Sequence, residues 1–267
     1  MSNQIISATK NVMICLLAIL LSWGTVDCNG VDSIEIDTEE KNISFAVLGN
    51  SISTYSGTLP KGYRNYYTSS KLSKNEMWWA QLSQKTGIIM IANSSWSGAT
   101  VGYRQDLLEA DSISFFYSDN RVNSLSRNGI PDIIIVLGGT NDWKNNVRLG
   151  NVECLQDVTT FYGAYSLMAE KIRNRYPSAI LVFCGILPRI QGTDSENKLG
   201  WTIRQGNEVI KEISQSFAAV YVDMDYCGIE NDFSQYTFDG LHPNAAGMEL
   251  IANELMNVVN KLVNNNN

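Results

Sequence analysis

Short runs of apolar residues, rich in valine and isoleucine, recur along the chain and are separated by longer amphipathic segments. Each run is continuous and does not alternate with polar residues, which is typical of strands that are buried on both faces of a sheet. The pattern predicts four clear strands and a weaker fifth, at Ser44–Leu48, Ile88–Ala92, Asp132–Leu137, Ala179–Phe183 and Ala219–Asp223.

Segments with helical periodicity lie between these runs. Ser73 and Glu76 have the spacing of a capping box, and Gly87 ends the helical segment that follows them. Asp157 is a candidate N-cap for a long helix that runs to Arg175, with a proline two residues beyond it. Two more helices are expected, over residues 202–216 and from about Asn244 to Val263.

Because strands and helices alternate throughout, we expect an α/β fold. The prediction is a parallel sheet of about five strands with helices on both faces, a three-layer α/β/α sandwich of the flavodoxin-like type. Two connections, residues 53–72 and 111–128, are long and carry several aromatic residues. Long loops in α/β domains are often functional.

The first 28 residues have the features of a targeting segment. Lys10 is the only charged residue before Asp27, and the apolar run from Val12 to Trp23 is too short to span a hydrocarbon core, which needs about 20 helical residues. A secretory signal peptide over residues 1–28 is therefore the preferred interpretation. A retained anchor or a lipid-modified Cys28 are alternatives.

This interpretation predicts a secreted, periplasmic or cell-surface protein with no membrane span after processing. It also predicts a single domain over residues 40–263 and a disordered tail at 264–267. No sequence feature specifies an oligomeric state.

Composition excludes several functional classes. The chain has 20 Lys and Arg against 27 Asp and Glu, a formal net charge of −7, and no basic run, which argues against a nucleic-acid partner. No phosphate-binding glycine motif is present, so no nucleotide cofactor is expected. The single histidine, His242, rules out metal sites that need two imidazoles. We expect neither a cofactor nor a metal.

Four polar motifs follow the predicted strands or precede the last helix. In open α/β sheets, ligands bind outside the carboxyl ends of the strands, so these motifs are the candidate site. They are Gly49-Asn50-Ser51, Ser94-Ser95-Trp96-Ser97-Gly98-Ala99, Gly138-Gly139-Thr140-Asn141-Asp142 and Asp239-Gly240-Leu241-His242-Pro243.

Three of these residues could form a nucleophilic relay. A serine hydroxyl needs a base to remove its proton, and imidazole is the usual base near neutral pH. Ser51 follows a strand and a glycine in a turn that can expose its hydroxyl. Asp239 precedes His242 by three residues, close enough for its carboxylate to reach Nδ1 and leave Nε2 facing the serine.

The oxyanion that forms when a serine attacks an ester carbonyl needs hydrogen-bond donors. The candidates are the backbone N–H groups of Ser51 and Gly98 and the side-chain amide of Asn141. A glycine at position 98 lets a carbonyl oxygen approach the backbone closely.

Together, the four motifs resemble the motif blocks of the SGNH hydrolases, also called the GDSL esterase/lipase family. The resemblance runs from Ser44 to Gly247 in the family's order, and the blocks around Asn141 and His242 match fully. The first block differs from the usual Gly-Asp-Ser because Asn50 replaces the aspartate. This change removes a negative charge beside Ser51. It also leaves open which side chain supports the loop that carries Ser51. The resemblance implies a serine esterase that hydrolyses carboxylic esters through an acyl-enzyme.

The substrate is predicted less directly. Aromatic residues near the motifs suit sugar rings, and the candidates are Tyr55, Trp96, Tyr103 and Trp143. With the acidic composition and the predicted secretion, they favour a small-molecule or glycan ester, most of all O-acetyl groups on carbohydrates. The alternatives are a lysophospholipase or thioesterase, a non-catalytic carbohydrate-binding protein on the same fold, and an acyltransferase.

Overall fold

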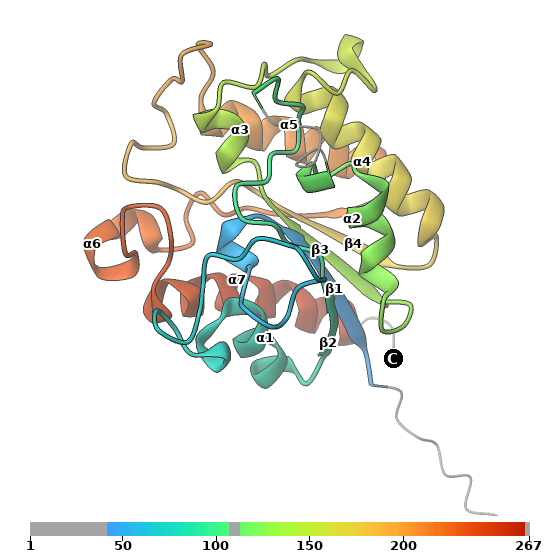
Figure 1. Ribbon diagram of the computed structural model, residues 1–267, viewed down its shortest axis with the longest axis vertical. Helices are drawn as coiled ribbons and strands as arrows, with labels where there is room; N and C mark the ends of the chain where they lie inside the picture. The colour runs from blue at the N-terminus through green and yellow to red at the C-terminus, as the bar shows by residue number, and fades with distance from the viewer. Residues whose placement is uncertain (1–41, 107–112, 265–267) are drawn as a thin grey trace, which may run out of the picture. The chain divides into compact units, whose positions relative to one another are not determined.

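The computed structural model describes residues 42–106 and 113–264. At its centre lies an all-parallel sheet with the strand order β2-β1-β3-β4-β5, the flavodoxin-like order (Figure 1). Each of the five predicted strands is confirmed to within one residue at either end. The strands are β1 (Ser44–Gly49), β2 (Ile89–Asn93), β3 (Ile133–Leu137), β4 (Ile180–Cys184) and β5 (Val220–Val222).

Helices cover both faces of the sheet, so the predicted three-layer sandwich is confirmed (Figure 1). On one face, Ala46 and Leu48 of β1 pack in a core with α2 (Asp119–Asn123), α4 (Phe161–Arg175) and α5 (Ile203–Ser216). On the other, Phe45 and Val47 join a core with α1 (Trp78–Thr86) and α7 (Ala245–Asn264). Continuous apolar runs satisfy both cores because successive strand residues point to opposite faces.

The signals at the two ends of the first helical segment are confirmed. The backbone N–H of Ser73 donates to Glu76 Oε2 at 2.7 Å, which completes a capping box at the turn before α1. Gly87 ends α1 in the left-handed conformation with φ 77°, where a glycine costs little.

The predicted N-cap of the longest helix on the first face is wrong. The cap of α4 is Thr160, whose hydroxyl accepts the N–H of Gly163 at 3.1 Å. Asp157 instead accepts the N–H of Thr159, inside the preceding turn. That turn packs against the start of α4 so closely that a Cβ on Gly163 would lie 2.1 Å from the carbonyl oxygen of Cys154. The helix therefore begins only after the turn is complete.

Three short helices were not predicted: α2, α3 (Thr140–Lys144) and α6 (Phe233–Tyr236). With four or five residues each, they are too short to produce a helical period in the sequence. Helix α2 lies in the predicted loop 111–128, and α3 carries the motif around Asn141. The predicted signal segment 1–28 and residues 265–267 lie outside the described residues. Within the described part of the chain, no helix has the length and hydrophobicity needed to cross a membrane.

The topology brings the motifs to one edge of the sheet. After β1 the chain forms β2 on one side, then crosses to form β3 on the other side of β1. The direction of winding therefore reverses between β1 and β3, and such a switch point leaves a crevice at the carboxyl ends of the strands. The loops that follow β1, β2 and β3 lie at this edge.

Candidate active site

Ser51 lies immediately beyond β1, at the start of a one-turn 3-10 helix, and its side chain is almost buried. The turn before it is tight, because a Cβ on Gly49 would lie 2.7 Å from the hydroxyl oxygen of Ser53. As the first residue of a helical turn, Ser51 has a backbone N–H without a partner inside that turn. The local sequence thus places both the hydroxyl and the N–H of Ser51 at the carboxyl end of the strand.

Asn50 supports this loop although it is not the usual aspartate. Its side-chain oxygen accepts the backbone N–H of Ile52 at 3.0 Å and so caps the turn that carries Ser51. An amide oxygen provides the acceptor that a carboxylate would provide, without a negative charge beside the serine. Support of the loop, which the sequence put in question, is therefore intact.

His242 and Asp239 contact Ser51 although they lie about 190 residues further along the chain. His242 Nε2 is 3.0 Å from Ser51 Oγ, and His242 Nδ1 is 2.8 Å from Asp239 Oδ2. The other oxygen of Asp239 accepts the backbone N–H groups of Leu241 and His242, at 3.1 and 2.8 Å. These two bonds hold the carboxylate in the turn and orient it towards the imidazole. The three residues selected from the sequence lie in hydrogen-bond contact in the order serine, histidine, aspartate.

The surroundings hold the histidine neutral and the aspartate ionised. Burial lowers the pKa of His242, the Asp239 carboxylate opposes this effect, and the positive charges of Lys71 and Lys144 add to it. Burial works against ionisation of Asp239, but the N–H groups of His242, from backbone and ring, outweigh it and lower the pKa of that carboxyl. A neutral imidazole can accept a proton from a serine hydroxyl.

The long connection 53–72 covers the histidine. The Tyr66 ring stacks on the His242 ring, with 3.7 Å between centroids and an interplanar angle of 10°. Its hydroxyl is 3.4 Å from Asp239 Oδ2, and the ammonium of Lys71 lies 3.5 Å from the centre of its ring. Tyr67 donates from its hydroxyl to the carbonyl of Pro243 at 2.8 Å. The sequence identified this connection as a long aromatic loop but not as the cover of His242.

The three predicted oxyanion donors come from loops that are tied together. The carbonyl of Gly49 accepts the N–H of Trp96, and the carbonyl of Ala99 accepts the amide of Asn141 at 2.9 Å. That bond uses one of the two amide hydrogens of Asn141 and fixes the direction of the other. Gly98 has φ +85°, and no atom lies within 4 Å of the Cβ it lacks, so the position both requires glycine and is open.

Asp142, in the third motif, connects this motif to the chain that follows the second motif. Its buried carboxylate accepts the N–H of Val101 at 2.9 Å and that of Gly102 at 2.7 Å. Burial raises the pKa of this carboxyl to about 7, although the two N–H groups oppose the rise. The carboxylate thus holds the loop after β2 against the first turn of α3.

Arg121 is a residue that the sequence did not single out, because it lies in a segment predicted to be a loop. Its side chain is fully buried and donates to the carbonyls of Gly49 at 2.7 Å and Ser94 at 2.6 Å, and to that of Ser114. Burial lowers its pKa to about 9. The guanidinium connects the end of β1, two residues before Ser51, with the loop that follows β2.

The four aromatic candidates for sugar contacts differ in exposure. Tyr55, Trp96 and Trp143 are less than 10% exposed, and Trp96 and Trp143 belong to the core on the α4 face. Their burial favours a packing role. Tyr103 is 40% exposed and is the candidate that presents a ring to solvent. Within residues 42–106 and 113–264, no group of three or more His, Cys, Asp or Glu could hold a metal ion.

Comparison with known proteins supports the resemblance seen in the motifs. The model of the GDSL-like lipase/acylhydrolase family matches residues 43–259. A multidomain esterase of Ruminococcus flavefaciens is 25% identical in an alignment of 229 positions that covers 78% of this chain and 27% of that protein. The chain thus spans about a quarter of the length of this curated relative.

Solved structures share the fold. A Bacteroides ovatus protein described as a GDSL-like lipase has a TM-score of 0.63 and 23% identity, over 83% of this chain and 100% of that one. A carbohydrate esterase of family 3 from Talaromyces cellulolyticus has a TM-score of 0.53 and 18% identity, over 84% of this chain and 99% of that one. With the family model, the sheet order and the position of the motifs, these findings identify the class: the chain belongs to the GDSL-like lipase/acylhydrolase family.

Proposed function

We propose that the protein is a serine esterase that hydrolyses carboxylic esters through an acyl-enzyme, with O-acetylated carbohydrates as its substrates. The observation that carries the proposal is the continuous contact from Ser51 Oγ to His242 Nε2 at 3.0 Å and from His242 Nδ1 to Asp239 at 2.8 Å. This geometry suits a nucleophile, a general base and a group that orients the base.

In the first half of the reaction, His242 Nε2 takes the hydroxyl proton of Ser51 while Oγ forms a bond to the ester carbonyl carbon. The carbonyl oxygen becomes an oxyanion, which the N–H groups of Ser51 and Gly98 and the amide of Asn141 stabilise. The tetrahedral intermediate then expels the alcohol oxygen, which takes the proton from the imidazolium. Asp239 stabilises the imidazolium while it is charged.

In the second half, water replaces the alcohol. His242 takes a proton from the water as its oxygen attacks the carbonyl carbon of the acyl-enzyme, and the same donors stabilise the second oxyanion. Collapse of this intermediate breaks the bond to Ser51 Oγ, which recovers its proton from His242, and releases the carboxylic acid. Transfer of the acyl group to water makes the overall reaction a hydrolysis.

Two observations favour acetylated carbohydrates over lipid or thioester substrates. Over residues 42–106 and 113–264, the exposed aliphatic side chains are scattered and form no long surface segment that suggests an acyl-chain tunnel, and Tyr103, five residues after Gly98, presents an exposed ring. A structural neighbour is also named as a carbohydrate esterase. The predicted signal segment at residues 1–28, followed by one domain over residues 40–263, fits an enzyme that meets such substrates outside the cell.

The test is acetate release by the purified protein from acetylated xylan and acetylated sialic acid, beside hydrolysis of long-chain acyl esters. We expect the acetylated glycans to be turned over faster, and faster turnover of the long chains would refute the carbohydrate assignment. Ser51→Ala should abolish all of these activities. Ser56→Ala, which changes an exposed serine in the same connection, is the matched control and should leave them intact.

A non-catalytic carbohydrate-binding protein on the same fold is the second candidate function. A serine-reactive fluorophosphonate separates it from an esterase. The esterase should be labelled at Ser51, and His242→Ala should prevent labelling because the hydroxyl then has no base. A binding protein would not be labelled at Ser51, with or without the His242→Ala substitution.

A further inference from the structure

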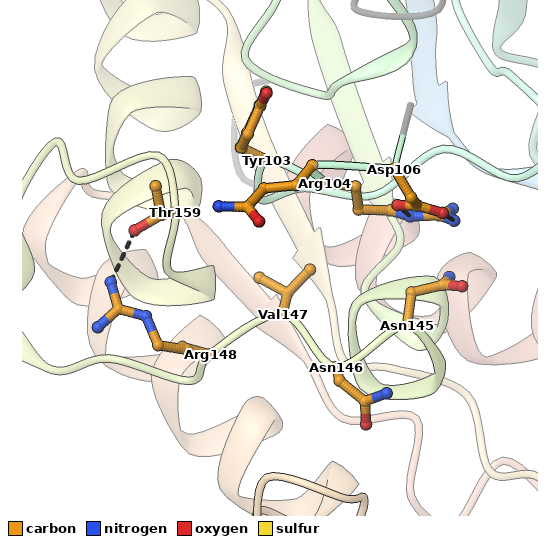
Figure 2. A pocket seen from close by; sticks show the side chains of 9 residues that line it. Tyr103, Arg104, Asp106, Asn145, Asn146, Val147, Arg148 and Thr159 are labelled. Atoms are coloured by element: carbon orange, nitrogen blue, oxygen red, sulfur yellow. Dashed lines mark hydrogen bonds and ion pairs between the residues drawn. The ribbon is translucent and has the colours of Figure 1, made fainter. Parts of the chain in front are cut away.

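A polar cavity of about 460 Å³ lies beside the candidate active site and plays no part in the proposed chemistry. Its volume is in the range of small-molecule sites, about 300–1,000 Å³. Figure 2 shows its two walls, one formed by the segment from Tyr103 to Asp106 and the other by the segment from Asn145 to Arg148, with Thr159 beside Arg148.

Each wall continues directly from one of the predicted oxyanion loops. The first wall begins five residues after Gly98. The second begins with Asn145, which follows Asn141 by four residues along α3. Positions four apart on a helix are neighbours on the same face, with about 5–6 Å between their Cβ atoms. Asn145 also donates to the carbonyl of Asn141, from its backbone at 2.9 Å and from its amide at 2.7 Å. The cavity therefore starts about one helical turn from the amide assigned to the oxyanion.

The two walls are held in register by buried contacts. The carboxylate of Asp142 binds the N–H groups of Val101 and Gly102, so the chain that leads to Tyr103 is fixed against α3. The N–H of Tyr103 donates to the carbonyl of Val158 at 2.7 Å, which attaches this wall to the segment of Thr159. The cavity is thus built on the same framework as the reacting groups.

Each arginine that lines the cavity is paired with a carboxylate. Arg104 binds Asp106 through two hydrogen bonds, and Arg148 binds the hydroxyl of Thr159 at 2.7 Å (Figure 2). Arg148 also binds Asp157, which is outside the lining, at 3.3 Å. The paired charges leave a wall of fixed donors and acceptors with no net charge. Such a wall matches hydroxyl groups better than a free carboxylate, since an anion would have to displace Asp106 or Asp157 from its arginine.

The remaining lining also suits a sugar. Three side-chain amides, of Gln105, Asn145 and Asn146, can each donate and accept hydrogen bonds. The Tyr103 ring is 40% exposed and is supported from the side by Phe115, with 5.5 Å between ring centroids. Figure 2 shows that the Tyr103 ring stands at the rim of the cavity and projects away from Val147 and Arg148. A ring at the rim, together with amides along the walls, suits the apolar face and the hydroxyl edge of a pyranose that reaches past the rim.

We propose that this cavity binds a neutral glycosyl unit of the substrate, next to the unit whose ester is attacked by Ser51. The inference rests on the proposed function, because the sugar in the cavity is taken to be part of the ester substrate. Binding of the sugar itself, however, does not require that the ester be hydrolysed.

Binding is tested without catalysis. Ser51→Ala is titrated with unacetylated xylotriose and cellotriose and with sialic acid, by calorimetry and by NMR. We expect the neutral sugars to bind to Ser51→Ala. Adding Tyr103→Ala or Arg148→Ala to this variant should weaken binding about three- to tenfold each, which is the effect of one lost contact. Tyr226→Ala, which removes an exposed tyrosine that does not line the cavity, is the matched control.

Absence of binding by both neutral sugars, or binding that the two cavity substitutions do not weaken, would overturn the proposal. Preferential binding of sialic acid would overturn the neutral assignment. If the sugars bind but no sugar acetate is hydrolysed, the proposed function fails while the cavity assignment stands.

Kinetics give the second measurement. In the protein with Ser51 intact, Tyr103→Ala should raise KM for an acetylated xylo-oligosaccharide about three- to tenfold more than KM for p-nitrophenyl acetate, which has no sugar to fill the cavity. An equal change for both esters would mean that Tyr103 is structural only, and would contradict the proposal.

Discussion

The group around His242 and the cavity beyond α3 lie at the same edge of the sheet, but their polar side chains are held in different ways. Around His242, the imidazole and the Asp239 carboxylate are each oriented by a second group, and the Tyr66 ring covers the imidazole. In the cavity, the arginines bind carboxylates that are themselves exposed, and Tyr103 is 40% exposed against 4% for Ser51.

This difference separates two tasks. Fixed and largely buried groups can stabilise a transition state without reorganising, which is the requirement for chemistry. Exposed groups whose charges are already paired can form and lose hydrogen bonds to a substrate hydroxyl at small cost, which is the requirement for reversible recognition. Substitutions around His242 should therefore act on kcat, and substitutions in the cavity should act on KM. The predictions below test that division.

The largest effect is expected from His242→Ala. No other imidazole exists in the chain to replace the base, so kcat/KM for any ester should fall by about 10⁴- to 10⁶-fold. Gln235→Ala changes an exposed residue shortly before the same turn and should have no effect on turnover. Substantial activity in the His242 variant, measured by acetate release, would refute the assignment of the base.

Asn141 and Asn145 allow a matched comparison on one face of α3. Asn141→Ala removes an oxyanion donor and should lower kcat by about 10²- to 10³-fold. Asn145→Ala removes a single hydrogen bond to the carbonyl of Asn141 and should lower kcat less than about tenfold. Steady-state kinetics on p-nitrophenyl acetate measure both. Equal losses would mean that the amide of Asn141 has no special role in the transition state.

Asp142→Ala should damage both regions, because its carboxylate joins them. The substitution leaves the buried N–H groups of Val101 and Gly102 without an acceptor, which costs about 1–3 kcal/mol each before the relief of carboxylate burial. We expect the free energy of unfolding to fall by about 2–4 kcal/mol in urea denaturation. Asp142→Asn keeps an oxygen for one of the two N–H groups and should lose less. An unchanged free energy of unfolding in Asp142→Ala would contradict the role of this carboxylate in holding the two loops together.

The smallest effect is a shift in pH dependence. Burial lowers the pKa of His242, so the acid limb of the kcat profile should lie below the ordinary histidine value of about 6.5. Activity is retained while the imidazole is neutral and is lost as the pH falls through its pKa. Lys71 also lowers this pKa, so Lys71→Met should raise it and move the acid limb to higher pH.

NMR can measure the same pKa directly, because the protein has one histidine and its ring signals need no assignment. Lys61→Met changes another exposed lysine of the same connection, one that does not act on the His242 pKa, so it is the control and should not change the titration. A Lys71 variant that titrates like the unsubstituted protein would show that the ammonium on Tyr66 does not act on His242.

The sequence predicted the framework because the framework depends on local patterns. Continuous apolar runs predict strands buried on both faces, and their alternation with helices predicts a parallel sheet with helices on both sides. The candidate site could be predicted because its motifs follow these strands directly. The N-cap at Asp157 was wrong for the same local reason: both Asp157 and Thr160 are good caps, and only the packing of the turn against Gly163 selects Thr160.

The sequence by itself therefore determined the class of fold, the order of the motifs and the identity of the one possible imidazole base. Only the tertiary structure decided that Tyr66 stacks on His242, that Arg121 connects the end of β1 with the loop after β2, and that the oxyanion loops continue into a polar cavity. The physical reason is range. A strand or a cap is set by neighbours along the chain, whereas the contact between Ser51 and His242 joins residues 191 positions apart and forms only when the sheet brings its strand ends together.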